Sequence, residues 1–365
     1  MLDRRLLKNF DLSLFLLTVA ICAYGMVILN SATLSLEFPP LYFVKRQALW
    51  IGLGLVIMFF ICLIDYINLA NWSRYLYFFN IGLLLLVPFI GVERYGAQRW
   101  IPLGFFDLQP SEIAKLVIII SLGRLLAERE DFEHFADLFP TFIHVALPMG
   151  LIIYQPDLGT SLVFLVIMFG MLFMAGAQIR HLAAIAAVGV ASLPLLFPLL
   201  EDYQKARLLV FINPDIDPLG VGYQILQSKI AIGSGGIAGK GLFAGSQAQR
   251  QFLPEQQTDF IFSVLGEELG LIGALLLFLL FALLIYRILR IASIAKDRFG
   301  FLICCGVAVM FTFQIVVNIG MTVGIMPVTG LPLPFISYGG SSMLLNLMAV
   351  GLVLNVGMRR HKIQF

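Results

Sequence analysis

The feature that most constrains this chain is a series of apolar stretches, all but the short fifth one long enough to cross a bilayer. A membrane-spanning helix needs about 20 mostly apolar residues. Ten such stretches occur, at 12–32, 47–65, 74–91, 111–127, 139–154, 158–176, 181–199, 260–287, 300–325 and 340–358. The sequence therefore predicts an all-α polytopic membrane protein with ten spans, organised as a single transmembrane domain over residues 1–365.

Composition leads to the same class of protein. Of the 365 residues, 60% are hydrophobic and only 13% are charged, whereas an average soluble domain is about a quarter charged. A soluble core of this size could not bury so much apolar surface, because the surface needs polar cover. Soluble, disordered and collagen-like chains are thereby excluded. The four cysteines lie inside apolar stretches and show neither a disulfide framework nor metal-ligand spacing.

The distribution of Lys and Arg predicts that both termini are cytoplasmic. Positive residues concentrate in the short cytoplasmic loops of membrane proteins, and most of them fall on one side if the N-terminus is inside. The one long hydrophilic segment, about 200–259 between the seventh and eighth spans, then forms a large extracellular loop. Long loops of this kind tend to be functional. We expect any chemistry to occur at the outer face of the cytoplasmic membrane.

Two charged residues lie within the fourth span. Glu112 and Lys115 are three residues apart, which places them on one helix face. Charges inside a span are costly and usually face a bundle interior or a cavity. The pair is interpreted either as a mutually neutralising structural pair or as part of a catalytic site. Pro110 would start this helix, with Ser111 as its N-cap.

Three polar residues are predicted at other outer boundaries. Asp157, between the fifth and sixth spans, is either a helix N-cap or a contact for a cation or polar substrate. Arg99 and Trp100 lie in the second outer loop. Such a pair either anchors the chain at headgroup level or holds a lipid phosphate.

The stretch 253–262 is the most informative. It places Asp259 at the mouth of an apolar span, next to the water-exposed loop. Partial desolvation there would raise the pKa of the carboxyl group, which suits a general base. Thr258 would orient it. Two alternatives stay open: Asp259 is a metal ligand, or Asp259 or Thr258 caps the following helix.

Two glycine-rich stretches complete the candidates. At 233–245, the phosphate-loop pattern fails because Ser234 stands where the pattern requires its first Gly, and Gly241 stands where it requires Ser or Thr. The glycines and Lys240 form either an anion-binding nest or a purely conformational element.

The run 330–342, which contains Ser337 and Ser341, has prolines and glycines at membrane depth. Irregular backbone there is tolerated where it lines a cavity, so we expect this segment to re-enter the outer leaflet and wall the same site.

Taken together, these motifs resemble the SEDS family (shape, elongation, division and sporulation). The resemblance rests on Pro-Ser-Glu-Ile-Ala-Lys at 110–115, Gln-Pro-Asp-Leu-Gly-Thr at 155–160 and Thr-Asp-Phe-Ile-Phe at 258–262. Gly-Lys-Gly at 239–241 and the run 334–342 follow the same pattern, in the same order. The stretches 96–100 and 326–330 favour the elongation branch, and the sporulation branch is close.

The resemblance implies a peptidoglycan glycosyltransferase that polymerises lipid II during cell elongation and cell-shape maintenance, releasing undecaprenyl pyrophosphate. It implies a divalent cation, Mg²⁺ or Mn²⁺, with ligands left unassigned, and no organic cofactor. The expected partner is a class B penicillin-binding protein, through its transmembrane helix and pedestal domain; no nucleic acid is expected. Asp259 is the expected general base, with Glu112 and Lys115 also catalytic. The candidate substrate-binding residues are Arg99, Trp100, Asp157, Arg207, Lys240, Thr258, Ser337 and Ser341.

Two other functions fit part of the pattern. A lipid II flippase would also have many spans and intramembrane charges, but transporters often show internal repeats. The sequence has no convincing repeat, and its polar motifs gather on one face, which favours surface chemistry. The second alternative is a non-catalytic scaffold that organises wall-building partners.

Overall fold

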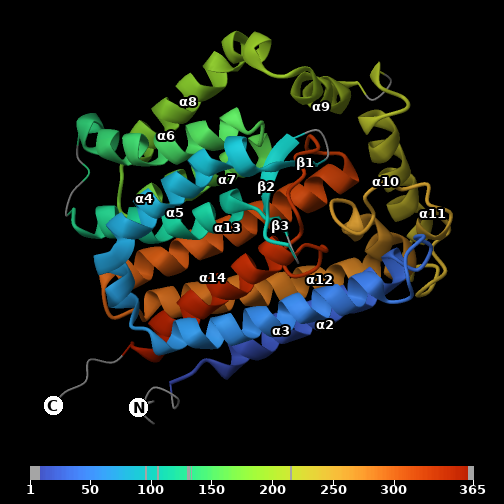
Figure 1. Ribbon diagram of the computed structural model, residues 1–365, viewed down its shortest axis with the longest axis horizontal. Helices are drawn as coiled ribbons and strands as arrows, with labels where there is room; N and C mark the ends of the chain where they lie inside the picture. The colour runs from blue at the N-terminus through green and yellow to red at the C-terminus, as the bar shows by residue number, and fades with distance from the viewer. Residues whose placement is uncertain are drawn as a thin grey trace.

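The computed structural model describes residues 9–94, 97–104, 107–129, 132, 134–213 and 216–360. Every apolar stretch found in the sequence forms a helix there (Figure 1). The ten corresponding helices are α2 (Leu12–Ala32), α3 (Tyr42–Leu63), α4 (Tyr66–Ile90), α5 (Pro110–Ala127), α6 (Phe139–Tyr154), α7 (Leu158–Met174), α8 (Ile179–Leu196), α12 (Ile261–Ser293), α13 (Arg298–Val323) and α14 (Gly340–Met358).

Seven helical segments in the described part of the chain are both long and apolar enough to cross a membrane. Helices α7 and α8 form shorter apolar segments, and α5 carries the charged residues Glu112, Lys115 and Arg124. The prediction of an all-α polytopic membrane protein is confirmed. The cytoplasmic location of the termini stays a prediction.

The interior of the bundle is formed by α5, α13 and α14. In Figure 1, α13 and α14 run between a layer of α2, α3 and α12 and a layer of α4 to α7, and the helices of neighbouring layers are in contact. Within their most apolar windows, 72% of α13 and 78% of α14 is buried, against 22% of α3. The peripheral helices instead expose large apolar side chains such as Phe60 and Phe89. This distribution suits a bundle whose solvent is lipid.

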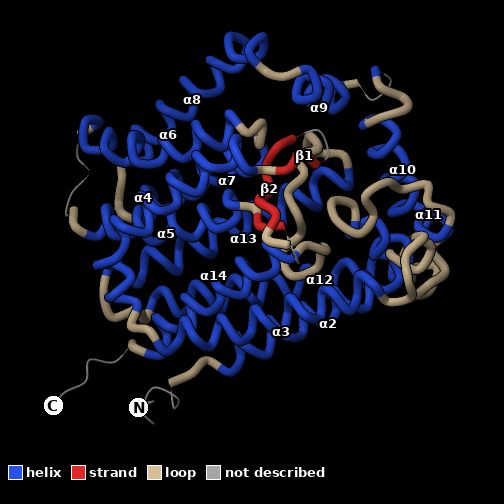
Figure 2. Tube along the Cα trace, viewed as in Figure 1, coloured by secondary structure: helices blue, strands red, loops and turns tan. Residues whose placement is uncertain are grey.

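A small antiparallel sheet between α4 and α5 was not predicted. Its strands are β1 (Val92–Arg94), β2 (Ala97–Pro102) and β3 (Asp107–Leu108), with β2 in the middle. Val92 pairs with Trp100, and Ile101 pairs with Leu108. Strands and long loops gather at the end of the molecule away from the start of α2 and the end of α14 (Figure 2). The sheet thereby holds Arg99 and Trp100 at that end.

The long hydrophilic segment is partly helical. It contains α9 (Asp202–Ile212), α10 (Val221–Gly235) and α11 (Ser246–Gln249). Helix α10 packs against α12 and α13. The segment is therefore attached to the transmembrane bundle through α10.

Candidate active site

Asp259 lies directly before α12. The helix begins at Ile261 with Phe260 in the N-cap position, and no side chain accepts a hydrogen bond as a cap. The alternative that Asp259 or Thr258 caps this helix is therefore wrong. Asp259 is partly buried.

Arg207 of α9 and Asp259 meet beside Gly330. A Cβ atom built on Gly330 would lie 3.6 Å from both Arg207 Nη1 and Asp259 Oδ2. Gly330 has a φ of 74°, in the region that favours glycine. The missing side chain at this position leaves room beside the two charged groups. The structure thus joins one predicted substrate-binding residue to the predicted general base.

The surroundings of Asp259 shift its acidity. Burial raises the pKa of its carboxyl group from 3.8 to about 6, which the Arg207 guanidinium opposes and the Glu255 carboxylate reinforces. A carboxyl group with this pKa is mostly ionised at neutral pH. Its pKa also lies close to the pH at which the protein works, as a general base requires. The desolvation expected from the sequence is present.

The backbone around Asp259 is held by α13 and by the 324–339 connection between α13 and α14. Asn318 Nδ2 donates to the carbonyl oxygens of Asp259 (3.1 Å) and Leu331 (2.8 Å). Tyr338 N donates to Gln257 O at 2.9 Å. The irregular segment near the C-terminus therefore walls the site, as the sequence predicted.

Thr258 and Ser337 serve this backbone frame. The Ser337 hydroxyl is buried, donates to Thr258 O at 2.7 Å and accepts from Leu333 N at 2.9 Å. The Thr258 hydroxyl lies 3.1 Å from Glu255 Oε2, so it orients Glu255 and not, as predicted, Asp259. Contacts of either residue with substrate stay a prediction.

A second group of predicted residues surrounds the start of α7. Asp157 is the N-cap of this helix and accepts from Thr160 N at 3.1 Å and Thr160 Oγ1 at 2.9 Å. Arg99 Nε donates to Gln155 O at 3.0 Å, its Nη2 donates to Pro156 O, and its Nη1 lies 3.8 Å from Asp157 Oδ1. The capping interpretation of Asp157 is confirmed, and β2 brings Arg99 to it.

Ser341 and Trp100 lie beside the same group. Ser341 Oγ donates to Asp107 O at 3.1 Å and accepts from Gln109 N at 3.2 Å, which joins β3 to the start of α14. Gln109 Nε2 lies 3.3 Å from Asp157 Oδ2. Trp100 is half-buried in β2. Substrate contacts of Trp100 and Ser341 stay predictions.

The two groups share the segment 329–331. A Cβ atom on Gly159 in α7 would lie 2.6 Å from Thr329 O and 3.3 Å from Leu331 Cγ. The next residue along that segment, Gly330, faces Arg207 and Asp259. Residues from α7, α9 and the chain before α12 therefore converge on one irregular segment.

Glu112 and Lys115 form the pair that the sequence predicted. Lys115 Nζ lies 2.7 Å from Glu112 Oε1, and the two residues are 0% and 3% exposed. Glu112 Oε2 is buried without a hydrogen-bond partner among the described residues. The catalytic role of the pair stays a prediction. Ser111 is not the N-cap: Gln109 holds that position, and the buried Ser111 hydroxyl has no hydrogen-bond partner in the described chain.

Lys240 belongs to a different cluster. Its Nζ donates to Glu267 Oε1 at 2.6 Å and to Ser246 Oγ at 2.8 Å. Glu267 and Glu268 in α12 are both fully buried, and sequence reasoning missed them. The available signal was two adjacent carboxylates within an apolar span, because intramembrane charges need partners.

A divalent cation fits the residues near Asp259. Mg²⁺ is usually bound by one or two carboxylates together with substrate phosphates. Asp259 and Glu255 interact electrostatically and supply two carboxylates. Groups of three or more potential metal ligands are absent from the described residues.

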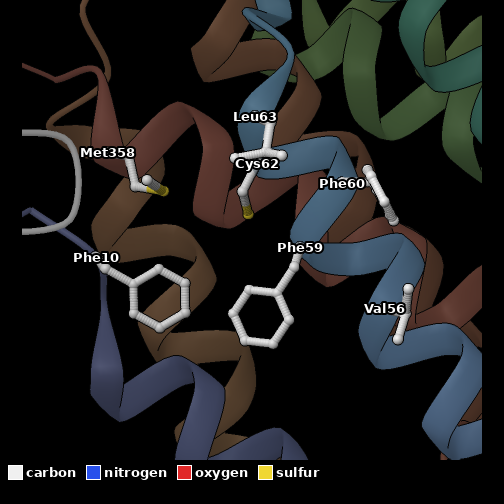
Figure 3. Close-up of a pocket in the computed structure, with 7 residues that line it drawn as sticks. All are labelled: Phe10, Val56, Phe59, Phe60, Cys62, Leu63 and Met358. Carbon is white, nitrogen blue, oxygen red and sulfur yellow. The ribbon is translucent and has the colours of Figure 1, made fainter. Parts of the chain in front are cut away.

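The structure also contains an apolar pocket of about 420 Å³ (Figure 3). It is formed where α3 and α14 end and just before α2 begins, and its lining residues are Phe10, Val56, Phe59, Phe60, Cys62, Leu63 and Met358. These residues include none of the predicted site residues. The pocket is therefore separate from the candidate active site.

The fold and site define a polytopic membrane protein with a carboxylate-containing polar site at the end of its bundle. Residues 12–362 match the FtsW/RodA/SpoVE family of cell cycle proteins, and the chain belongs to this family. The expected SEDS membership is confirmed.

Two curated relatives and one solved structure illustrate the match. The Stage V sporulation protein E of Bacillus subtilis (strain 168) is 41% identical over 95% of this chain and 96% of its own. The peptidoglycan glycosyltransferase MrdB of Escherichia coli (strain K12) is 38% identical over 96% and 94%. A chain from a peptidoglycan synthase complex, described for coordination of polymerization and crosslinking, superposes with a TM-score of 0.84 at 36% identity over 97% and 99%.

Proposed function

We propose that this protein is a peptidoglycan glycosyltransferase that polymerises lipid II at the outer face of the cytoplasmic membrane during cell elongation. The observation that carries the proposal is the partly buried Asp259 beside Arg207. Relatives named as peptidoglycan glycosyltransferases support the reaction class. A substrate with a lipid tail and a sugar head requires a site where a membrane bundle meets water, and the irregular segments around Asp259 support such a location.

The proposed reaction needs a base and positive charge. The acceptor sugar hydroxyl loses its proton to Asp259 as its oxygen bonds to the anomeric carbon of the donor. The donor's bond to pyrophosphate breaks, and the electron pair leaves with the lipid-linked pyrophosphate. Arg207, beside Asp259, stabilises the charge that develops on the leaving group. When bound, a divalent cation would supply further charge neutralisation at the leaving group, with Glu255 as the nearby carboxylate that remains free to hold it.

The partner we propose is a class B penicillin-binding protein that docks through its transmembrane helix and pedestal domain. The likeness to a chain from a peptidoglycan synthase complex supports such an assembly. Crosslinking would belong to that partner.

The testing experiment is reconstitution in liposomes with lipid II, Mg²⁺ and a class B penicillin-binding protein. We expect glycan strands from the wild-type chain and none from Asp259→Asn. Leaflet exchange of lipid II without strands would identify a flippase. If Asp259→Asn forms as many glycan strands as the wild-type chain, Asp259 is not the general base.

The scaffold alternative is tested in cells. If Asp259→Asn retains partner binding and still supports wall synthesis, the chain acts as a scaffold. Loss of wall synthesis with partner binding intact supports the transferase.

A further inference from the structure

The geometry points to a positioning role for Lys240: we propose that it acts through Glu267 to hold the first segment of α12, which begins just after Asp259. The inference rests on the proposed function, because the affected reaction is the polymerisation attributed to Asp259. It assigns Lys240 a role other than direct phosphate binding.

Helix α12 is interrupted at Gly270, which has φ 60° and ψ −156°. The interruption separates a short segment, 261–269, from the rest of the helix. A backbone of this kind leaves hydrogen-bond donors and acceptors without helical partners, and at membrane depth these must be satisfied by protein. Residues 236–241 satisfy them.

Backbone hydrogen bonds run in both directions between 236–241 and the break in α12. The amides of Lys240 and Gly241 donate to the carbonyls of Glu267 (3.0 Å) and Glu268 (2.9 Å). In return, the amides of Leu271 and Ile272, which a continuous helix would direct to those same carbonyls, donate to the carbonyls of residues 236 (3.0 Å) and 237 (3.1 Å). The glycine-rich segment thus takes the place of helical hydrogen bonds.

The close approach explains one of the glycines. A Cβ atom on Gly239 would lie 2.1 Å from Glu268 O, and Gly239 has a φ of 78°. Any side chain there would push the two segments apart. The glycine-rich stretch is therefore conformational, with its backbone engaged by α12.

The Lys240 side chain reinforces this junction. Its amide and its ammonium group both bind Glu267, the first through the carbonyl and the second through the carboxylate at 2.6 Å. The carboxylate of Glu267 is fully buried, and Ser246 Oγ (3.0 Å) and Gln247 N (3.0 Å) also donate to it. The adjacent Glu268 accepts from Ser31 Oγ at 2.5 Å, which ties the same turn to α2.

Loss of the Lys240 charge would leave a buried carboxylate without its counter-ion, a state that is strongly unfavourable. The 261–269 segment would shift to hydrate Glu267, and Asp259 lies two residues before its start. Misplacement of a catalytic group by about 1 Å costs roughly 100-fold in rate. The effect should therefore fall on kcat, with little change in KM for lipid II.

A double-mutant cycle separates positioning from phosphate binding. We expect Lys240→Met alone to lower kcat by about tenfold or more. In the Glu267→Gln background, the same substitution should cost less than about threefold, because the buried charge that needs Lys240 is gone. Lys240→Arg, which keeps the charge, should retain most of the activity of the wild-type chain. A lysine that binds pyrophosphate would instead raise KM equally in both backgrounds, and that result would overturn the proposal.

A second measurement does not depend on activity. Hydrogen exchange of amides in 261–269 should increase in Lys240→Met and return toward the wild-type rate in the double variant. Glu128→Gln serves as the matched control, because Glu128 forms a surface ion pair with Arg124 at 2.8 Å and such pairs contribute little. Unchanged exchange in Lys240→Met would contradict the proposal even if the variant were inactive. A wild-type chain that makes no polymer would refute the proposed function alone.

Discussion

At the scale of single residues, the chemistry of Asp259 depends on three neighbours with different effects. Burial disfavours its charged form, Arg207 favours it and Glu255 disfavours it. The balance leaves a carboxylate that is ionised at neutral pH and still a competent proton acceptor. Because each contribution comes from a separate source, each can be altered alone.

Asp259→Asn is expected to abolish polymerisation while raising the melting temperature at pH 7.5. The folded-state pKa of Asp259 is raised from 3.8 to about 6, so its ionisation above that pH destabilises the fold. The neutral isostere avoids this penalty, and the stability gain should shrink as the pH falls from 6 toward 4. Thermal unfolding over this pH range is the measurement. A lower melting temperature at pH 7.5 would show that the carboxylate is structural.

Arg207→Met is expected to shift the acid limb of the kcat/KM profile to a pH above 6. The guanidinium lowers the pKa of Asp259, so its removal should raise that pKa. The midpoint of the acid limb is the quantity to compare. Lys205→Met on the same helix is the control, since Lys205 pairs with the exposed Asp202 at 3.5 Å. If the midpoint of the acid limb does not move in Arg207→Met, the limb does not report the ionisation of Asp259.

At the scale of elements, helix termini and irregular segments build the site. Helix α7 begins against the 329–331 segment, and α12 is broken and rejoined through 236–241. Helix α5 contributes a buried charged pair within one turn. The positions of the functional side chains therefore depend on how these segments pack.

Gly159→Ala is expected to lower activity by displacing the 329–331 segment. The added methyl group would lie 2.6 Å from Thr329 O, and overpacking of this kind typically costs about 1–3 kcal/mol. Steady-state polymerisation and thermal unfolding measure the two effects. Gly150→Ala in α6 is the matched control, because a Cβ atom there meets nothing within 4 Å. If Gly159→Ala and Gly150→Ala have the same polymerisation rate and the same melting temperature, the 329–331 segment has room to adjust.

Lys115→Ala is expected to impair folding and activity severely. It leaves the Glu112 carboxylate uncompensated in the interior, which costs about 3–5 kcal/mol. The Glu112→Gln/Lys115→Met double variant removes both charges and should recover most of the stability without recovering turnover. Detergent-solubilised melting temperature and the polymerisation assay distinguish the two outcomes. A fully active Lys115→Ala would place the pair outside the catalytic machinery.

At the scale of the whole molecule, the two ends of the bundle differ. The start of α2 and the end of α14 lie at one end, while the sheet and long loops gather away from them (Figure 2). The polar site is built among those loops, and the apolar pocket lies at the other end. This asymmetry suits a reaction at one membrane face.

A topology test follows from this asymmetry and from the Lys and Arg distribution. A reporter fused after Phe365 should be active only in the cytoplasm, and one inserted near Leu219 only outside. Compartment-specific reporters such as a phosphatase and a fluorescent protein give opposite signals. Reversed labelling would place the Asp259 site on the cytoplasmic face and contradict the proposed reaction.

The sequence by itself determined the properties that depend on short stretches of chain. Each span is recognisable because lipid requires about 20 consecutive apolar residues. The Glu112–Lys115 pair follows from helical periodicity, and the cap at Asp157 follows from its place before α7. Asp259 could be nominated because it adjoins both a span and a hydrophilic segment.

Only the tertiary structure decided which distant residues meet. It placed Arg207 and Gly330 beside Asp259, and it joined Lys240 to Glu267, 27 residues away. It also revealed the strand pairing around Arg99 and the break at Gly270. Hydrophobicity and periodicity show that a segment is a helix with an apolar or a polar face. They do not show which distant segment packs against that face, and these contacts depend on it. That choice is made by the packing of the whole bundle.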